Sequence, residues 1–283
     1  MSISRRESGV GSATRALASQ VPPVFMLPPV ACSLFGGVLA GAFAPVPGVV
    51  HATAIFAAVY TAHVKDGYVD FHVRDEDDDH PLTEWGCKAA LVGSSTLFVT
   101  CLLVIWLLGG LGAALLTLPT WLIAYHHAPQ LDTNPVTATT GYPLGIALSI
   151  LGGYYVQAGG LAAVPVAFAV VFLVLLSGVK VVDDAQDFEY DRSIQKRTVA
   201  VVVGPRRART AAYALMLTAL LLVVGFAALA VFPPSSVAAV AGFGVVAAIA
   251  RRADPELATM LLVRGSYVFL ALLLVAVWFR PLG

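Results

Sequence analysis

Residues 161–191 read LAAVPVAFAVVFLVLLSGVKVVDDAQDFEYD. Up to about residue 183 this stretch is apolar over roughly the 20 residues that an α-helix needs to cross the hydrocarbon of a bilayer. It then turns acidic within a few positions. The stretch therefore predicts a membrane-spanning helix that ends in a cluster of carboxylates.

The rest of the chain has the same apolar character. Of its 283 residues, 58% are hydrophobic and only 12% are charged, and the mean hydropathy of +0.83 lies far outside the range of soluble domains. A β-barrel would instead show weak alternation over short segments. We therefore expect an all-α, polytopic transmembrane bundle of about nine helices. The predicted spans lie near residues 23–44, 47–70, 86–108, 110–127, 139–158, 161–183, 208–231, 235–251 and 258–279.

The positions of the basic residues predict how the bundle is oriented. With the N-terminus inside, every Lys and Arg except Arg280 falls in a segment on the cytoplasmic side, which is the pattern of the positive-inside rule. We expect a multi-pass protein of the plasma membrane with a cytoplasmic N-terminus and site and an external C-terminus. Residues 1–20 are predicted to be a flexible cytoplasmic tail, and residues 21–283 a single transmembrane domain.

Two acidic clusters share the predicted cytoplasmic face. In the second cluster, Asp184, Asp187 and Asp191 recur at i, i+3 and i+7, an arc of about 60° on a helix. Ionisable groups beside hydrocarbon are costly and usually belong to a functional site. We therefore predict that these three carboxylates form one stripe at the mouth of the bundle.

The first cluster follows the second span. Asp66, Asp70 and Arg74 are four residues apart and would share one face of a helix. Because like charges at this spacing repel, a bound cation is the simplest way to stabilise Asp66 and Asp70. The acidic run 75–79 is more typical of a solvated loop.

Ligands that are all oxygen, with no His or Cys at fixed spacing, favour a hard cation such as Mg²⁺. We therefore predict that Mg²⁺ is held by the five aspartates named above and that the substrate carries phosphate. The remaining phosphate charge would be neutralised by basic residues near the clusters. These are Arg74, Lys180, Arg192, Lys196 and Arg197. Lys196, Arg197, Arg206, Arg207 and Arg209 are equally compatible with contacts to lipid headgroups.

The chain resembles the UbiA superfamily of intramembrane prenyltransferases in helix number and in two acidic motifs after the second and sixth helices. The sequence Asp184-x-x-Asp187-x-x-x-Asp191, followed by Arg192 and Lys196-Arg197-Thr198, matches the second motif closely. The resemblance covers essentially residues 21–281.

The first motif departs from that family's pattern. Asp66 stands where the family has Asn, Gly67 replaces the next Asp, Asp70 matches, and Arg74 replaces the last Asp. With fewer carboxylates, one Mg²⁺ would be held differently unless Asp75 or Asp77 substitutes.

The resemblance implies that a polyprenyl group moves from its diphosphate to a lipophilic acceptor with release of pyrophosphate. The implied partners are a prenyl diphosphate of C15–C20 or longer, the acceptor and membrane lipid, without nucleic acid. Aromatic side chains near the metal would stabilise the carbocation. The candidates are Tyr68, Phe71, Tyr125, Tyr142, Phe188 and Tyr190.

Two other functions stay open on the sequence alone. The departures at Gly67 and Arg74 are compatible with a family member that binds isoprenoid diphosphates or lipids without turning them over. A secondary transporter is also a polytopic bundle with acidic groups, but such proteins usually place ionisable sites near the bilayer midplane. The one-sided clusters favour an enzyme.

Overall fold

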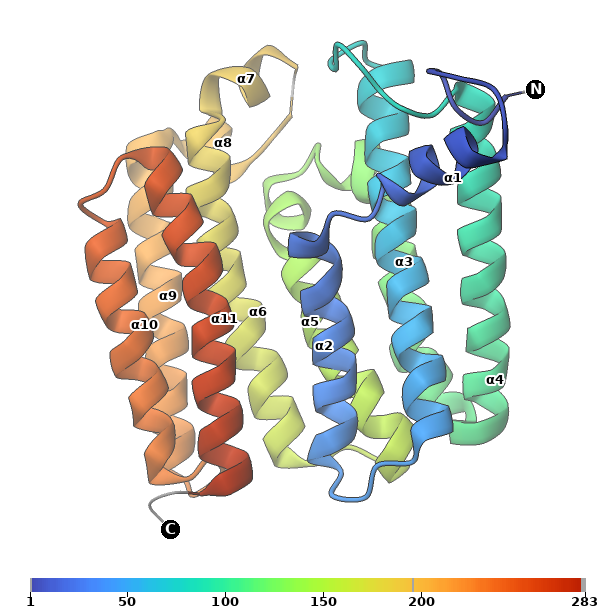
Figure 1. Cartoon of the computed structure of the whole chain (residues 1–283). Coiled ribbons are helices and arrows are strands. Elements are labelled where there is room, and N and C mark those ends of the chain that lie inside the picture. The colour runs from blue at the N-terminus through green and yellow to red at the C-terminus, as the bar shows by residue number, and fades with distance from the viewer. Residues whose placement is uncertain (1, 195, 281–283) are drawn as a thin grey trace. The chain divides into compact units, whose positions relative to one another are not determined.

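The computed structural model describes residues 2–194 and 196–280, and in these residues every regular element is a helix (Figure 1). The one strand-like pairing there is an isolated bridge between Ser4 and Leu82. The prediction of an all-α fold is confirmed.

The chain divides into two compact units. Unit 1 comprises residues 1–132 and 148–161, and unit 2 comprises residues 133–147 and 162–283. The division passes through α5 (Pro135–Ala158), whose second half belongs to unit 1. The single domain over residues 21–283 therefore stays a prediction.

Unit 1 is built around paired membrane-length helices. Besides the second half of α5, unit 1 contains α1 (Val10–Ala18), α2 (Pro23–Leu39), α3 (Pro45–His72), α4 (Glu84–Tyr125) and the short π-helix η1 (His127–Leu131). The helices α3 and α4 pack along each other, and α2 packs on α3 (Figure 1). Pro23 and Pro45 begin their helices, a position where the fixed φ of proline suits the first turn.

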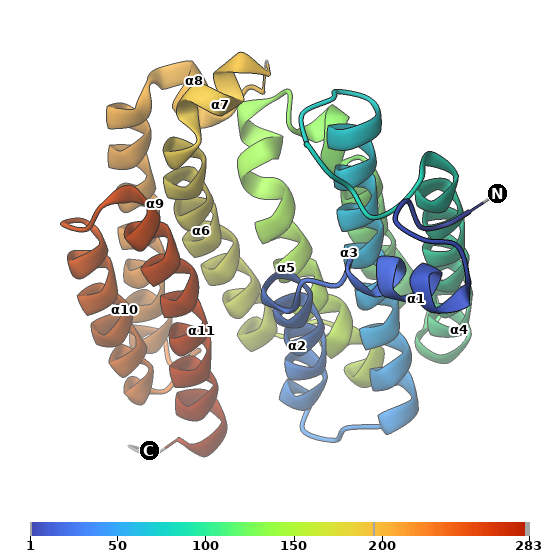
Figure 2. The same ribbon diagram turned by 45° about the horizontal axis from the view of Figure 1, so that its top comes forward.

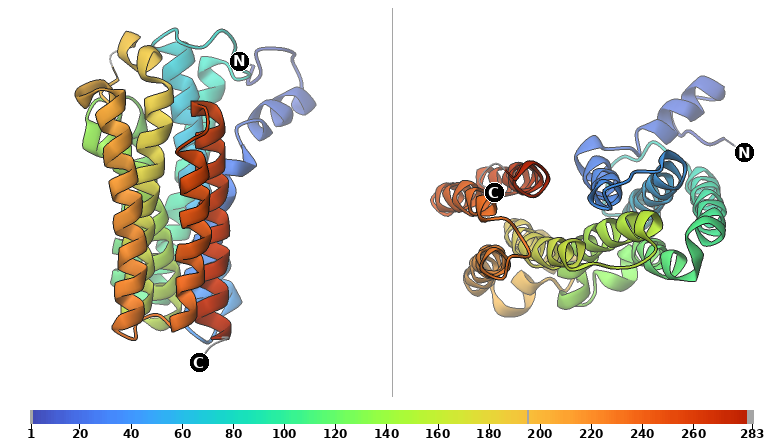
Figure 3. Two further views of the ribbon diagram at one scale, coloured as in Figure 1. Left: turned by 90° about the vertical axis from the view of Figure 1, so that its left-hand side faces the viewer. Right: turned by 90° about the horizontal axis from the view of Figure 1, so that it is seen from below.

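Unit 2 contains the predicted acidic helix end. Its elements are α6 (Ala163–Gln186), α7 (Phe188–Ser193), α8 (Val199–Val203), α9 (Pro205–Ala228), η2 (Pro234–Ser236), α10 (Val237–Ala250) and α11 (Pro255–Phe279). The short helices α7 and α8 follow the end of α6 (Figure 2). The helices α9, α10 and α11 run alongside one another, and α6 packs on α9 (Figure 3).

Each of the nine predicted spans corresponds to a helical segment in the described part of the chain. The third and fourth spans are the two halves of α4, which meet at Gly110, where φ is 78° and the backbone is not helical. Five helices, α3, α4, α6, α9 and α11, are long and apolar enough by themselves to cross a membrane. The shorter α10 and the helices rich in Pro or Gly, α2 and α5, complete the set.

Residues 2–20, predicted to be a flexible cytoplasmic tail, make specific contacts with unit 1. The backbone of Arg5 donates to Pro81 and that of Thr83 donates to Ile3, each at 3.0 Å. The Tyr60 hydroxyl, on α3, donates to the carbonyl of Leu17 at the end of α1. The segment thus pairs with residues 81–83 and contacts α3, and its flexibility stays a prediction.

The backbones of α2 and α5 come into direct contact in unit 1. A Cβ atom added to Gly153 would overlap the carbonyl of Ser33, and one added to Gly36 would overlap the carbonyl of Ile150. Small residues commonly allow this close approach in membrane bundles. Beside this contact, the Ser33 hydroxyl and His51 Nδ1 are hydrogen-bonded at 2.7 Å, which links α2 to α3.

We expect Gly153→Ala to lower the free energy of unfolding by about 1–3 kcal/mol, since the added methyl group meets backbone atoms that cannot rotate away. Gly93→Ala on α4 is the matched control, because nothing lies within 4 Å of an added Cβ there. Denaturation of both variants in detergent micelles tests this. Equal stability of the two variants would contradict the close helix contact.

Candidate functional site

The second acidic cluster lies at the end of α6, but not on one continuous helix. The helix α6 ends at Gln186, and Asp187 is a junction residue with φ −93° and ψ 16° before α7 begins at Phe188. The prediction of a single helical stripe is therefore wrong for this segment. The amide of Asp191 still donates to the carbonyl of Asp187 at 2.8 Å, so the break is local.

Asp184 is the most enclosed carboxylate of this cluster, with only 4% of its surface exposed. Its Oδ1 accepts a hydrogen bond from Lys180 Nζ at 2.6 Å, and Lys180 also donates to Asp183 at 3.0 Å. The other oxygen of Asp184, Oδ2, is buried and has no hydrogen-bond partner among the described residues. An unsatisfied buried carboxylate oxygen is costly and fits a position where a cation binds.

Asp191 is also buried, with 6% exposure, whereas Asp187 between them is exposed. Burial, together with the nearby charge of Asp184, raises the pKa of Asp191 to about 6. A bound cation would oppose this shift by favouring the ionised form. Two carboxylates of the predicted motif thus lie in enclosed, electrostatically coupled positions.

The basic residues predicted to bind phosphate around this cluster are mostly accessible. Arg192 and Arg197 are exposed, and Lys196 Nζ lies 5.9 Å from the ring centroid of Tyr190. Lys180 differs, because it is already ion-paired with Asp183 and Asp184. Its observed contacts position the carboxylates.

The first acidic cluster lies at the end of α3. Asp66 and Asp70 are one helical turn apart on α3, as predicted, but the helix ends at His72, so Arg74 lies beyond it. Asp66 is 44% exposed, and its Oδ1 is 4.0 Å from His127 Nε2. Asp70 is more enclosed and lies beside Arg74 at 3.6 Å.

Arg74 lies among three carboxylates of unit 1. Its guanidinium is 2.8 Å from Asp132 and 3.6 Å from both Asp70 and Glu76, and its side chain is 17% exposed. Although burial disfavours the charge, the hydrogen bond that Arg74 donates to Asp132 and the three negative charges raise the pKa of Arg74 above its usual value. Arg74 supplies the positive charge in this cluster.

Two members of this cluster were missed by the sequence reasoning. Glu76 was assigned to a solvated acidic run, yet its side chain is only 4% exposed. Asp132 was not considered at all, although it is the only acidic residue between Glu84 and Asp183. A single acidic residue in an otherwise apolar region could have indicated that Asp132 belongs to a functional site.

The predicted aromatic residues are partly brought together. Lys65 Nζ lies 5.8 Å from the ring centroid of Tyr68 and 5.2 Å from that of Tyr125, so these two rings flank one cation in unit 1. Tyr142 lies on the part of α5 that belongs to unit 2 and is half-buried. Tyr190, on α7, is largely exposed.

Residues 2–194 and 196–280 contain no group of three or more His, Cys, Asp or Glu residues already arranged to hold a metal ion. The donor set nevertheless fits a hard cation in part. Asp184 Oδ2 and Asp132 Oδ1 are buried oxygens without a hydrogen-bond partner in this part of the chain. Carboxylate oxygens are the ligands that Mg²⁺ prefers, and this ion usually completes its shell with water and substrate phosphate.

Comparison with known families identifies the class of protein. The model of the UbiA prenyltransferase family matches residues 80–273, which include the whole second cluster. The chain belongs to the UbiA prenyltransferase family, and it is a multi-pass membrane protein. No curated protein matches the sequence.

Solved structures share the fold at low sequence identity. A UbiA homologue from Aeropyrum pernix K1, solved in its apo form, matches with a TM-score of 0.72 and 14% identity over 89% of this chain and 96% of the other. A UbiA homologue from Archaeoglobus fulgidus bound to GPP and Mg²⁺ matches with a TM-score of 0.67 and 17% identity, over 94% of this chain and 99% of the other. A digeranylgeranylglyceryl phosphate synthase matches with a TM-score of 0.68 and 15% identity, over 93% of this chain and 97% of the other.

Proposed function

We propose that this protein is a Mg²⁺-dependent prenyltransferase that moves a polyprenyl group from its diphosphate to a lipophilic acceptor. The observation that carries the proposal is the environment of Asp184. One of its oxygens is held by Lys180 and the other is buried without a partner, in the motif position where the family places acidic residues. The homologue from Archaeoglobus fulgidus, bound to GPP and Mg²⁺, supports both the donor class and the metal.

Asp184, Asp187 and Asp191 would hold the ion. When bound, Mg²⁺ would neutralise charge on the departing diphosphate. Lys180 fixes Asp184 in place through its 2.6 Å hydrogen bond. Arg192, Lys196 and Arg197, which follow the motif, would bind the diphosphate oxygens.

The reaction requires no protein nucleophile. The allylic C–O bond breaks, the diphosphate leaves with the bonding electrons, and the acceptor forms the new bond to carbon and loses a proton. The apolar helices would exclude water that would otherwise react with the carbocation. The rings of Tyr68 and Tyr125 already flank the cation of Lys65, and they are candidates to stabilise positive charge, together with Tyr142 and Tyr190.

Arg74 has a different role in this proposal from the one that the sequence suggested. Since three carboxylates surround its guanidinium, binding a diphosphate would require breaking those ion pairs. We propose that Arg74 neutralises the first cluster in place of a metal ion. Asp66, the exposed member of that motif, remains a candidate ligand for a cation that arrives with the substrate.

The membrane orientation is also part of the proposal. The acidic ends of α3 and α6 and the basic residues of the positive-inside pattern belong to the same predicted face. The donor would therefore reach the site from the cytoplasmic side of the plasma membrane. The acceptor would be a lipid-soluble molecule that enters from the bilayer.

The test is prenyl transfer by the purified protein in lipid nanodiscs. Radiolabelled geranylgeranyl diphosphate is supplied with a lipid extract as the source of acceptor, with either Mg²⁺ or EDTA. We expect Mg²⁺-dependent release of pyrophosphate and a new labelled lipid whose mass identifies the acceptor. Asp187→Asn should reduce both products.

The same experiment separates the alternative functions. Binding of the diphosphate without pyrophosphate release, across several donor lengths and extracts, would indicate a non-catalytic binder. Solute uptake into vesicles that requires no prenyl donor would indicate a transporter. Either result would overturn the proposal.

A further inference from the structure

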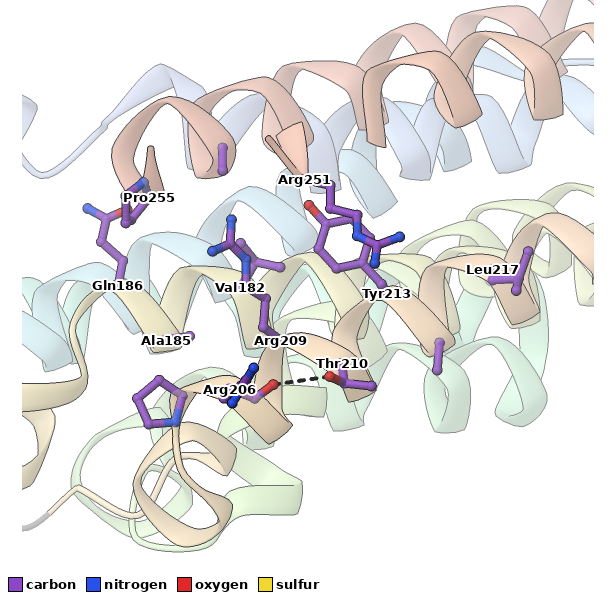
Figure 4. A pocket seen from close by; sticks show the side chains of 13 residues that line it. Val182, Ala185, Gln186, Arg206, Arg209, Thr210, Tyr213, Leu217, Arg251 and Pro255 are labelled. Carbon is purple, nitrogen blue, oxygen red and sulfur yellow. Dashed lines mark hydrogen bonds between the residues drawn. The ribbon is translucent and has the colours of Figure 1, made fainter. Parts of the chain in front are cut away.

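Unit 2 contains a cavity that the proposed reaction does not use. Its volume is about 720 Å³, and it opens among α6, α9, the end of α10 and the first turn of α11 (Figure 4). Three arginines lie along it: Arg206 and Arg209 on the first turns of α9, and Arg251 at the end of α10. The cavity thus combines several positive charges at one end of the helices of unit 2.

The cavity lies on the face of α6 that points away from the acidic cluster. Val182, Ala185 and Gln186 line it. At 100° per residue these three positions centre on the side of the helix roughly opposite Lys180 and Asp184. The arginines of the cavity therefore belong to a different site from the carboxylates of the proposed reaction.

The three arginines are available to a ligand. Within the described ranges, no carboxylate forms an ion pair with Arg206, Arg209 or Arg251. The nearest acidic positions along the chain are Asp254 and Glu256, beside the lining residue Pro255, and the Asp254 side chain instead caps α11 by accepting from the Leu257 amide. A group of arginines without a carboxylate partner favours an anionic ligand, in particular one with phosphate oxygens.

The wall of the cavity further along α9 from the arginines is apolar. Ala214 and Leu217 extend the lining along α9, and Leu217 is about 18 Å from Pro205 at the rise of an α-helix. Leu217 is 57% exposed on a helix long and apolar enough to cross a membrane, so this wall is accessible from the lipid. A soluble anion would use only the arginine end, whereas a lipid would use both ends.

We propose that this cavity binds an anionic phospholipid of the cytoplasmic leaflet, with its phosphate at Arg206, Arg209 and Arg251 and its acyl chain along Ala214 and Leu217. Basic pockets between transmembrane helices on this side of a membrane are a recurrent mode of lipid recognition. The buried hydroxyl of Tyr213, which lies beside Arg209, would supply a further polar contact at the level of the glycerol. The proposal is independent of the prenyl transfer reaction.

The experiment measures binding of short-chain phosphatidylglycerol to the full-length protein in neutral detergent by native mass spectrometry. We expect one saturable site that the double variant Arg209→Gln/Arg251→Gln weakens by about tenfold or more, because charge-assisted hydrogen bonds are lost. The matched control is Arg207→Gln/Arg252→Gln, which removes the same charge from exposed neighbours that do not line the cavity. It should weaken binding by less than about twofold.

A further variant and two further ligands identify what the cavity binds. Ala214→Phe keeps every arginine but fills the apolar wall, so it should also weaken phosphatidylglycerol binding. Equal losses in the two arginine pairs would show a diffuse electrostatic effect and overturn the proposal. It would also fail if phosphatidylcholine bound as tightly, or if inorganic phosphate occupied the site with the same affinity as the lipid.

Discussion

Asp184→Asn is expected to lower kcat for pyrophosphate release by about a hundredfold or more, a loss typical of removing one preorganised electrostatic contact to a transition state. The side chain is buried, its Oδ1 is held by Lys180, and its Oδ2 has no partner in the described structure. Asparagine has nearly the same shape but no charge, so the cation that stabilises the leaving diphosphate would be bound more weakly. Steady-state assays over a range of Mg²⁺ concentrations measure this effect. The Mg²⁺ concentration that gives half-maximal activity should rise.

Asp183→Asn is the matched control for this prediction. Asp183 adjoins Asp184 and also accepts a hydrogen bond from Lys180, but it is more exposed and lies outside the acidic motif. We expect its kcat to stay within a few-fold of the wild type. If the two variants lost activity equally, the assignment of the metal to Asp184 would be wrong, and the effect would be traced to Lys180.

The sequence predicted the helices well because each span is a local property. A stretch of about 20 apolar residues is enough to predict a helix across a bilayer, and Gly110 separates the two halves of α4 at the boundary between the predicted spans 86–108 and 110–127. The closely matching acidic motif likewise lies at the end of α6, as its position in the chain predicted.

What the sequence did not predict depends on contacts between distant residues. Arg74 and Asp132 are 58 positions apart, and nothing local shows that their side chains meet. The backbone hydrogen bonds of Ile3 and Arg5 are made with residues 81–83, which are far away in the sequence. The break of α6 at Asp187 has neither Gly nor Pro at the junction, so periodicity alone extended the helix. Contacts of Arg206 and Arg209 with lipid headgroups were considered from the sequence, but it did not show that these residues line one cavity with Arg251, because that depends on how the helices pack.

Arg74→Met is expected to lower the free energy of unfolding by about 3 kcal/mol, because it leaves three carboxylates close together without a cation. Asp70, Glu76 and Asp132 all lie within 3.6 Å of the guanidinium, in an environment that is largely closed to water. Thermal unfolding in detergent measures the loss. Mg²⁺ should restore part of the stability of this variant, since a divalent ion can replace the missing positive charge, whereas the wild-type cluster should respond little to added Mg²⁺.

Two variants sharpen this test. Lys88→Gln removes an ion pair of similar length, 2.6 Å to Glu84, but both of its partners are exposed, and we expect no measurable change in the unfolding temperature. Arg74→Asp introduces the acidic residue that the resemblance to the family implies at this position, and the stability of this variant should become strongly dependent on Mg²⁺. If Arg74→Met and Lys88→Gln behaved alike, or if Arg74→Asp did not respond to Mg²⁺, Arg74 would not be the cation that takes the place of a metal in the first cluster. Rescue of Arg74→Met by Mg²⁺ but not by an equal ionic strength of Na⁺ would show that a bound divalent ion, rather than general screening, replaces the guanidinium.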